Sequence, residues 1–458
     1  MKTVCMKFGF VSKTVFAASE FSLSKLRWLA PTLLCGAIAS TLLLIYASLV
    51  PLKYTPVSWE ETQTRWRGIA WLSLGIGNRA DWIANALVVM PSAFLFSGAV
   101  DYRRKSRWSL ILLGPVIFLF LAAIVLGIEL VQVWFPPRTV SQNDIFAGWV
   151  GAAVGVGTWA VFGRWMAFAL EYFVSLDSTL SRIRWILGVL CLASVVYTLY
   201  PLDFVFSDEE FSEKAATGRI RLGIAFGDFF GLENIKATIL SFGKLLPFGL
   251  WLGLSRRRHF PWLLIPLLSL ALEAVQIPIF SKFATSRDVA ASIFGGWSGW
   301  VVAQLHPKWT PWLHREWIWN LSSLAWSLAL VGFFNLRFTS ILHDDREITA
   351  RWNEFFTAPL LRYYYTSEYS ALSNLAGKLG MFGVLGILLA IAGWIRIGSC
   401  SSRRFCIGLA WTFAIGVLIE VMQIYLLPLV PDASDVGIYS TGFALGYVVT
   451  AIVLGKKS

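Results

Sequence analysis

A pattern of one glutamate, one glutamine, one aspartate and two glycines occurs three times in the chain with identical spacing, E-x2-Q-x11-D-x6-G-x3-G. The three copies are Glu129, Gln132, Asp144, Gly151 and Gly155; Glu273, Gln276, Asp288, Gly295 and Gly299; and Glu420, Gln423, Asp435, Gly442 and Gly446. Carboxylates accept hydrogen bonds and exchange protons, so the glutamate and aspartate are the members that could do chemistry. The fixed spacing indicates a repeated structure.

Helices must position these side chains. Glu129 and Gln132 lie three residues apart in an apolar run, so they share one helix face, about 9 Å below the helix end at 1.5 Å per residue. Asp144 follows a short loop, where it could cap the next helix and interact with the positive end of its dipole. Because the loop folds the chain back, we expect Glu, Gln and Asp to converge near one membrane face.

The composition indicates a membrane protein. Of 458 residues, 57% are apolar and only 14% are charged, too few for the surface of a soluble monomer. Several apolar runs reach the roughly 20 residues that cross a bilayer as a helix. We therefore predict an all-α polytopic membrane protein with about 12 transmembrane helices. These are expected near residues 28–50, 80–100, 108–134, 143–162, 184–203, 235–254, 260–280, 288–305, 317–336, 371–396, 405–428 and 435–455.

Charge in the loops predicts the orientation. The net charge of +12 reflects basic loops rather than nucleic-acid binding, and we expect no nucleic-acid partner. Basic and acidic loops alternate: 103–105, 256–258 and 403–404 are basic, whereas 60–61, 208–210 and 344–345 are acidic. Both termini of this multi-pass protein are therefore expected in the cytoplasm, with the helices in the inner (cytoplasmic) membrane.

The repeat predicts three four-helix units. We expect a cytoplasmic N-terminal segment at 1–27 and units at 28–165, 184–305 and 317–455. The segment Lys244–Gly249 resembles Lys378–Gly383 on the second helix of the later units, whereas the first has Asn85 and Pro91 there. We expect Lys244 and Lys378 to pair with the glutamates of their own units. The glycines are expected to pack helices closely.

The chain resembles the VanZ-like family of bacterial membrane proteins, named for an accessory factor in teicoplanin resistance. The resemblance rests on the stretch from Asn85 to Pro91, the Glu/Gln helix, Pro137-Arg138, and Asp144 with its glycines. It is best in the first unit. In the third unit, Leu429 occupies the position of the basic residues Arg138 and Lys282, so we expect this unit to be a structural copy. The resemblance implies a role in the cell envelope and an effect on glycopeptide antibiotic susceptibility.

Two interpretations of the polar cluster are open. In the structural one, Asp caps the fourth helix, Gln bonds to loop backbone and Glu pairs with Arg138 or Lys282. In the functional one, the cluster lines an outward-facing pocket for a polar head group, because an ionisable residue in a span is a functional candidate by default. The candidate binding residues are Asn85, Glu129, Gln132, Arg138, Asp144, Glu273, Gln276, Asp288, Glu420, Gln423 and Asp435.

Three functions are compatible with these features. We favour a non-enzymatic protein that binds an envelope lipid or a lipid-linked glycan or cell-wall precursor, with membrane lipids as partners. The alternatives are a membrane-embedded enzyme that uses the Glu/Asp cluster and a lipid or solute transporter. No zinc pair, phosphate-binding loop, nucleotide fingerprint or serine elbow occurs, so we expect no cofactor and no metal.

Overall fold

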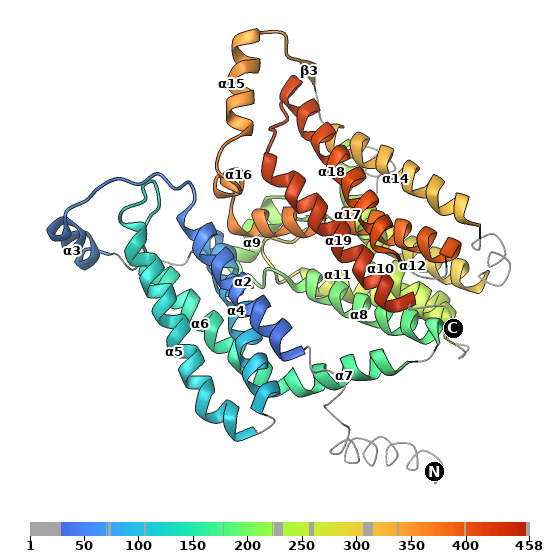
Figure 1. Cartoon of the computed structure of the whole chain (residues 1–458), viewed down its shortest axis with the longest axis horizontal. Helices are drawn as coiled ribbons and strands as arrows, with labels where there is room; N and C mark the ends of the chain where they lie inside the picture. The colour runs from blue at the N-terminus through green and yellow to red at the C-terminus, as the bar shows by residue number, and fades with distance from the viewer. Residues whose placement is uncertain are drawn as a thin grey trace.

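The protein is an assembly of long helices, seen in a computed structural model (Figure 1). The structure describes residues 29–454 except 70, 72–74, 105–106, 177, 222, 224–231, 256–260, 306–314, 337–338 and 398–399. The expected N-terminal segment at 1–27 and the basic loop at 256–258 lie outside the described residues.

Every apolar segment predicted to cross the membrane is a helix, with ends displaced by a few residues at most. The long helices are α2 (Leu29–Leu49), α4 (Ile76–Arg104), α5 (Arg107–Gln132), α6 (Gln142–Thr158), α8 (Thr179–Leu199), α10 (Leu232–Leu254), α11 (Pro261–Gln276), α12 (Ser286–Gln304), α14 (Glu316–Asn335), α17 (Glu368–Ile397), α18 (Ser402–Tyr425) and α19 (Ala433–Leu454). Helices suit a bilayer because each satisfies its own backbone hydrogen bonds.

Ten spans are long and apolar enough to cross a membrane among the described residues, rather than twelve. The two predicted spans not among the ten are in the second copy of the motif. Helix α11 has only 16 residues, and α12 carries Arg287 and Asp288 in its first turn. The fold is that of an all-α polytopic membrane protein.

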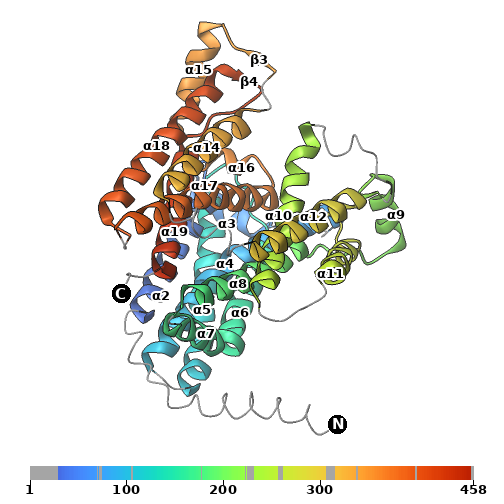
Figure 2. The same ribbon diagram turned by 90° about the vertical axis from the view of Figure 1, so that its right-hand side faces the viewer.

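The long helices pack in three groups that follow chain order (Figures 1 and 2). The first group is α2 with α4, α5 and α6, the second is α8 with α10, α11 and α12, and the third is α14 with α17, α18 and α19. In each, the second and fourth helices pack closely. The third group contacts the first through α17 and α4, and the second through α19 and α8.

Short elements follow the first helix of each group. They are the helices α3 (Trp59–Arg67), α9 (Asp208–Ala216), α15 (Asp345–Phe355) and α16 (Leu361–Tyr364), and the strands β1 (Ile220–Arg221) and β3 (Ser340–Ile341). Strand β1 pairs in parallel with β2 (Ala284–Thr285), and β3 pairs antiparallel with β4 (Leu426–Leu427). We call the end of the bundle that bears these elements the loop end. At the opposite end, the π-helix η3 (Trp159–Gly163) leads into α7 (Arg164–Ser175), which runs across the ends of neighbouring helices (Figure 1).

One backbone hydrogen bond recurs in all three groups at the loop end. The residue two positions after the motif glutamine accepts, through its carbonyl, an N–H from the segment after the first helix. The donor–acceptor pairs are Thr55–Trp134, Val205–Pro278 and Leu342–Tyr425, each at 2.8 Å. The chain is therefore tied down beside each copy of the motif in the same way.

Candidate functional site

The glycines of the motif bring the second and fourth helices of each group into backbone contact. A Cβ at Gly151 would lie 2.0 Å from the Ala86 carbonyl oxygen. The equivalent distances are 1.9 Å from Gly295 to Phe242 and 2.5 Å from Gly442 to Leu379. No side chain fits at such distances, so the expected packing role of the glycines follows from geometry.

These contacts correct the alignment expected for the lysines. The first motif glycine contacts Ala86, Phe242 and Leu379 in the three groups. The residues directly before these contacts are Asn85, Ser241 and Lys378, so these three positions are equivalent. Lys378 is therefore equivalent to Asn85, and Lys244 lies three residues further along its helix. The two lysine segments look alike because positions three apart lie on nearly the same helix face.

The motif glutamate holds the turn that starts the fourth helix. In each copy its carboxylate accepts the backbone N–H of the residue twelve positions later. The pairs are Glu129 with Ser141 at 3.4 Å, Glu273 with Thr285 at 2.8 Å and Glu420 with Asp432 at 2.9 Å. All three glutamates are buried. The sequence pattern did not predict this bond, because the donating residues Ser141, Thr285 and Asp432 share no residue type.

In the first two copies, the residue that caps the fourth helix is not the motif aspartate. Ser141 is the N-cap of α6 and Thr285 that of α12, and their hydroxyls accept the N–H of Asp144 and Asp288 at 3.0 and 3.1 Å. The aspartate lies in the first turn, where the helix dipole favours a carboxylate. In the third copy, Asp432 accepts the N–H of Ser434.

The motif glutamine binds main chain in two of the copies. The Nε2 of Gln132 donates to Ser48 O at 2.9 Å, and that of Gln423 donates to Phe334 O at 3.4 Å. Both acceptors are at the end of the first helix of the group. Gln276 instead donates within its own helix, to the Oε2 of Glu273 at 3.2 Å and to the Leu272 carbonyl at 3.5 Å. The glutamine therefore stabilises the bundle rather than projecting into open space.

In the first copy, the described hydrogen bonds to the two carboxylates come from amide, hydroxyl and backbone donors, and Arg138 lies close enough to act electrostatically on Glu129. Asn85 Nδ2 donates to Asp144 Oδ1 at 2.8 Å, and Ser141 Oγ bonds to Asp144 Oδ2 at 2.6 Å. Glu129 is 6% exposed. Asp144 is partly exposed. The aspartate of this copy is thus bound by an amide and a hydroxyl.

Basic side chains pair with the acids of the second copy. Lys244 Nζ lies 3.7 Å from Glu273 Oε2, as predicted, and an Arg287 N–H group lies 3.1 Å from Asp288 Oδ1. Arg287 also donates to Asn234. This copy therefore closes on itself through two ion pairs.

The third copy is closed by tyrosines and a lysine. Lys378 pairs with Asp435 and donates to the Tyr363 hydroxyl at 2.9 Å, and that hydroxyl donates to Asp435 at 2.8 Å. Burial and the nearby carboxylates raise the pKa of Tyr363, so it stays a donor. The Tyr439 hydroxyl donates to Glu420 at 2.8 Å. The prediction that Lys378 pairs with Glu420 is wrong.

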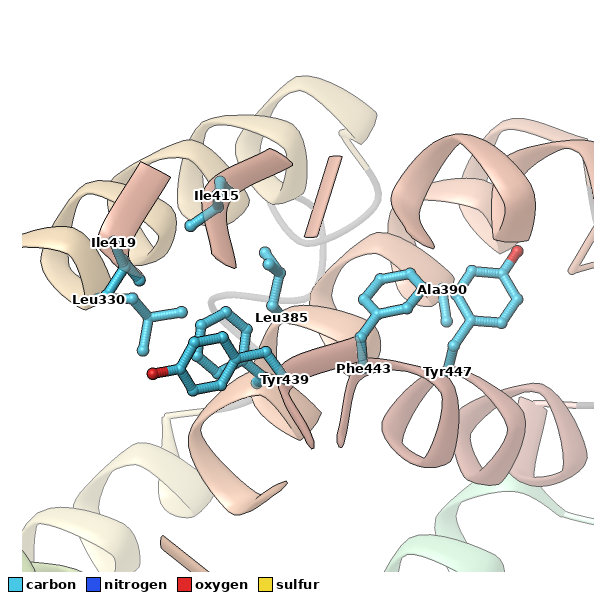
Figure 3. Close-up of a cluster of buried hydrophobic side chains, with 9 residues drawn as sticks. Leu330, Leu385, Ala390, Ile415, Ile419, Tyr439, Phe443 and Tyr447 are labelled. Atoms are coloured by element: carbon cyan, nitrogen blue, oxygen red, sulfur yellow. The ribbon is translucent and has the colours of Figure 1, made fainter. Parts of the chain in front are cut away.

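Tyr439 belongs to a buried apolar cluster of the third group (Figure 3). Its ring stacks on Phe382 at 4.1 Å between centroids. Figure 3 shows its hydroxyl directed away from Phe443 and Tyr447. The same motif position holds Gly148 and Ser292 in the other copies, so only the third copy supplies a phenol to its own glutamate.

The basic residues expected beside the glutamates bind main chain instead. Arg138 donates to the carbonyls of Ala47 and Val50 at 2.5 and 2.6 Å, and its guanidinium lies 4.3 Å from the Tyr364 ring centroid. Lys282 donates to Tyr197 O at 3.1 Å. The hydrogen bonds of Arg138 and Lys282 therefore go to backbone carbonyls at the ends of helices rather than to the glutamates as expected.

Two cations that the motif search missed anchor the loops. Lys214 of α9 is fully buried and donates to Gln276, Ile277 and Ile279 carbonyls at 2.5 to 2.8 Å. Burial lowers the pKa of Lys214 to about 8. Arg351 of α15 donates to Gln423 O at 2.9 Å. Their signal in the sequence is a basic residue in a short helix, which is not specific, since α15 also contains Arg346.

No set of metal ligands stands out in the part of the chain that the structure describes. No group of three or more His, Cys, Asp and Glu side chains there could hold a metal ion. The site chemistry is thus that of carboxylates, amides and hydroxyls.

Comparison with known proteins places the first group of helices in a family. Residues 6–163 match the model of the VanZ/LLP1 family, a stretch that contains the first copy of the motif and ends in η3. The other two copies lie beyond it. No curated protein and no solved structure matches the chain. The protein is a helical membrane protein whose residues 6–163 match the VanZ/LLP1 family model.

Proposed function

We propose that the first copy of the motif binds the polar head group of an envelope lipid, and that the other two copies are structural. One observation carries this proposal: Glu129 and Asp144 accept hydrogen bonds from neutral donors, whereas Glu273, Asp288 and Asp435 each form an ion pair. Glu420 has the Tyr439 hydroxyl. Only the first copy leaves carboxylates for a ligand.

The free groups define the chemistry of the ligand. Ionised carboxylates accept hydrogen bonds but cannot donate them. Two arginines of the first group are engaged elsewhere, Arg138 with helix carbonyls and Arg79 with Glu210 at 2.8 Å. The head group must therefore offer donors, as the hydroxyls of a lipid-linked glycan do. We take a lipid-linked glycan or cell-wall precursor as the ligand class.

The chain is proposed to consist of three four-helix units in the inner membrane. Basic residues end α4, and acidic residues begin α9 and α15, so the loop end faces outward with both termini in the cytoplasm. The first copy then meets lipids of the outer leaflet. Binding there changes how a cell-wall precursor is displayed and so alters susceptibility to drugs, such as glycopeptides, that recognise it.

Binding to a defined probe tests the proposal. The full chain in lipid nanodiscs is titrated with a fluorescent polyprenyl-linked disaccharide. Glu129→Gln and Asp144→Asn together are expected to weaken binding about tenfold, because one lost charged hydrogen bond is worth roughly 1.5–3 kcal/mol. Glu273→Gln with Asp288→Asn is the matched control and should bind like wild type if folded. Equal binding by all three proteins would show that the first copy is not the site.

A further inference from the structure

A cavity of about 830 Å³ opens on the first group of helices, at the end opposite the loop end. It lies between α5 and the run of α6 and η3. Its walls include Ile111, Pro115 and Phe118 on one side and Ala153, Val156 and Val161 on the other. It lies within segments apolar enough to cross a membrane, so its natural occupant is hydrocarbon.

An ion pair closes one end of this cavity. Arg164 lies 3.3 Å from Asp101 Oδ1, and Trp159 Nε1 donates to Asp101 Oδ2 at 3.3 Å. The Asp101 side chain is only 8% exposed, whereas that of Arg164 is 49% exposed. Asp101 thus has partners for both oxygens, but Arg164 uses one of its five N–H donors there.

The π-helical turn η3 shapes the cavity. Trp159 packs so tightly against glycines that a Cβ at Gly98 or Gly163 would lie 2.8 or 2.4 Å from its ring. Because the Trp159 ring packs against these glycines, it leaves space at the cavity wall. Gly157, which lines the cavity, has nothing within 4 Å of where a Cβ would be. Such π turns are frequent at functional sites.

The charge at this end suits an anionic group. Because a guanidinium binds phosphate with two parallel hydrogen bonds, Arg164 is placed to hold a phosphate whose chain enters the apolar cavity.

We propose that the cavity between α5 and η3 binds a membrane phospholipid, with one acyl chain along α5 and the phosphate on Arg164. This site is separate from the proposed glycan site and lies at the other end of the same helices. A phospholipid there would wedge between α5 and η3 and fix the start of α7. The inference does not depend on what the loop end binds.

Photocrosslinking tests this inference. The full chain in nanodiscs of phosphatidylcholine and phosphatidylglycerol receives a trace of phosphatidylglycerol with a diazirine in its acyl chain, and labelled peptides are mapped. Labels are expected to concentrate on residues 111–118 and 153–161. A diacylglycerol with the same diazirine chain, which lacks phosphate, should label these residues about tenfold less.

Variants separate a specific site from general lipid contact. Gly157→Leu fills the cavity and should abolish the local labelling, whereas Gly127→Leu, at an open position outside the lining, should not. Arg164→Gln should bring phospholipid labelling down to that of diacylglycerol, and Arg164→Lys should restore part of it. Labelling spread evenly over the exposed helix faces and unchanged by Gly157→Leu and Arg164→Gln would overturn the inference.

Discussion

The Nδ2 of Asn85 donates to the carboxylate of Asp144 at 2.8 Å, in the place where Lys378 pairs with Asp435 in the third copy. An amide in one copy and an ammonium in the other face the same aspartate. The exchange leaves Asp144 with its negative charge unneutralised, whereas that of Asp435 is neutralised. This difference is the basis for assigning the first copy to a ligand and the third to the scaffold.

Neutralising the aspartates should therefore have unequal effects on stability. Asp435→Asn leaves the half-buried Lys378 without its ion-pair partner, so the loss should approach the roughly 3–5 kcal/mol that breaking a fully buried pair costs. Asp144→Asn removes no ion pair and should cost less than about 1 kcal/mol. Thermal unfolding of both variants in detergent checks this, and similar losses in both would refute the difference in roles.

Because the helices touch at the motif glycines, replacing these glycines with any larger residue should lower the stability of the fold. Gly295→Ala places a methyl group 1.9 Å from the Phe242 carbonyl oxygen, and overpacking of this kind typically costs about 1–3 kcal/mol. Gly437→Ala in α19 is the control, because nothing lies within 4 Å of its Cβ. The unfolding temperature should fall for the first variant only. An unchanged Gly295→Ala protein would mean that α10 and α12 are not packed this closely.

Burial of Lys214 predicts a pH dependence of stability. Its pKa is lowered to about 8 from 10.5, so the unfolded chain binds the proton more tightly than the folded one. The buried charge lowers the free energy of unfolding below pH 8. This free energy should rise as the pH increases from 8 to 10.5. The comparison is the unfolding temperature of wild type and Lys214→Met across this range. The rise should be smaller in the variant, and parallel curves would contradict the burial of a titrating lysine.

The sequence was sufficient to predict the helical fold because apolar runs of this length have few other solutions in a bilayer. It also identified the motif whose glycines join the second and fourth helices. It did not predict the position of Lys378 correctly. The sequence match with Lys244 is displaced by three residues, and residues three apart lie on nearly the same helix face, so the pattern cannot distinguish the two alignments. Only the backbone contacts at Gly442 and Gly295 fix the register.

The partners of the motif were harder to predict than its members. Arg138 and Lys282 have the right charge for the glutamates, but helix ends expose carbonyls that compete for the same donors. The Tyr363 hydroxyl comes from α16, which no spacing rule connects to Asp435, and the Tyr439 hydroxyl comes from a motif position that holds Gly148 and Ser292 in the other copies. Contacts of this kind depend on how the groups fold, so they require the structure.

The most direct test of the central claim compares the motif copies in cells. Glu129→Gln with Asp144→Asn, Glu273→Gln with Asp288→Asn, and Glu420→Gln with Asp435→Asn are each expressed in a strain lacking the gene. Restoration of the wild-type response to envelope-directed antibiotics is scored beside the thermal stability of each purified protein. We predict that the first pair abolishes complementation at unchanged stability, and that the other pairs lose activity only as far as they lose stability. Loss of activity in step with stability in all three copies would contradict a ligand site at Glu129 and Asp144.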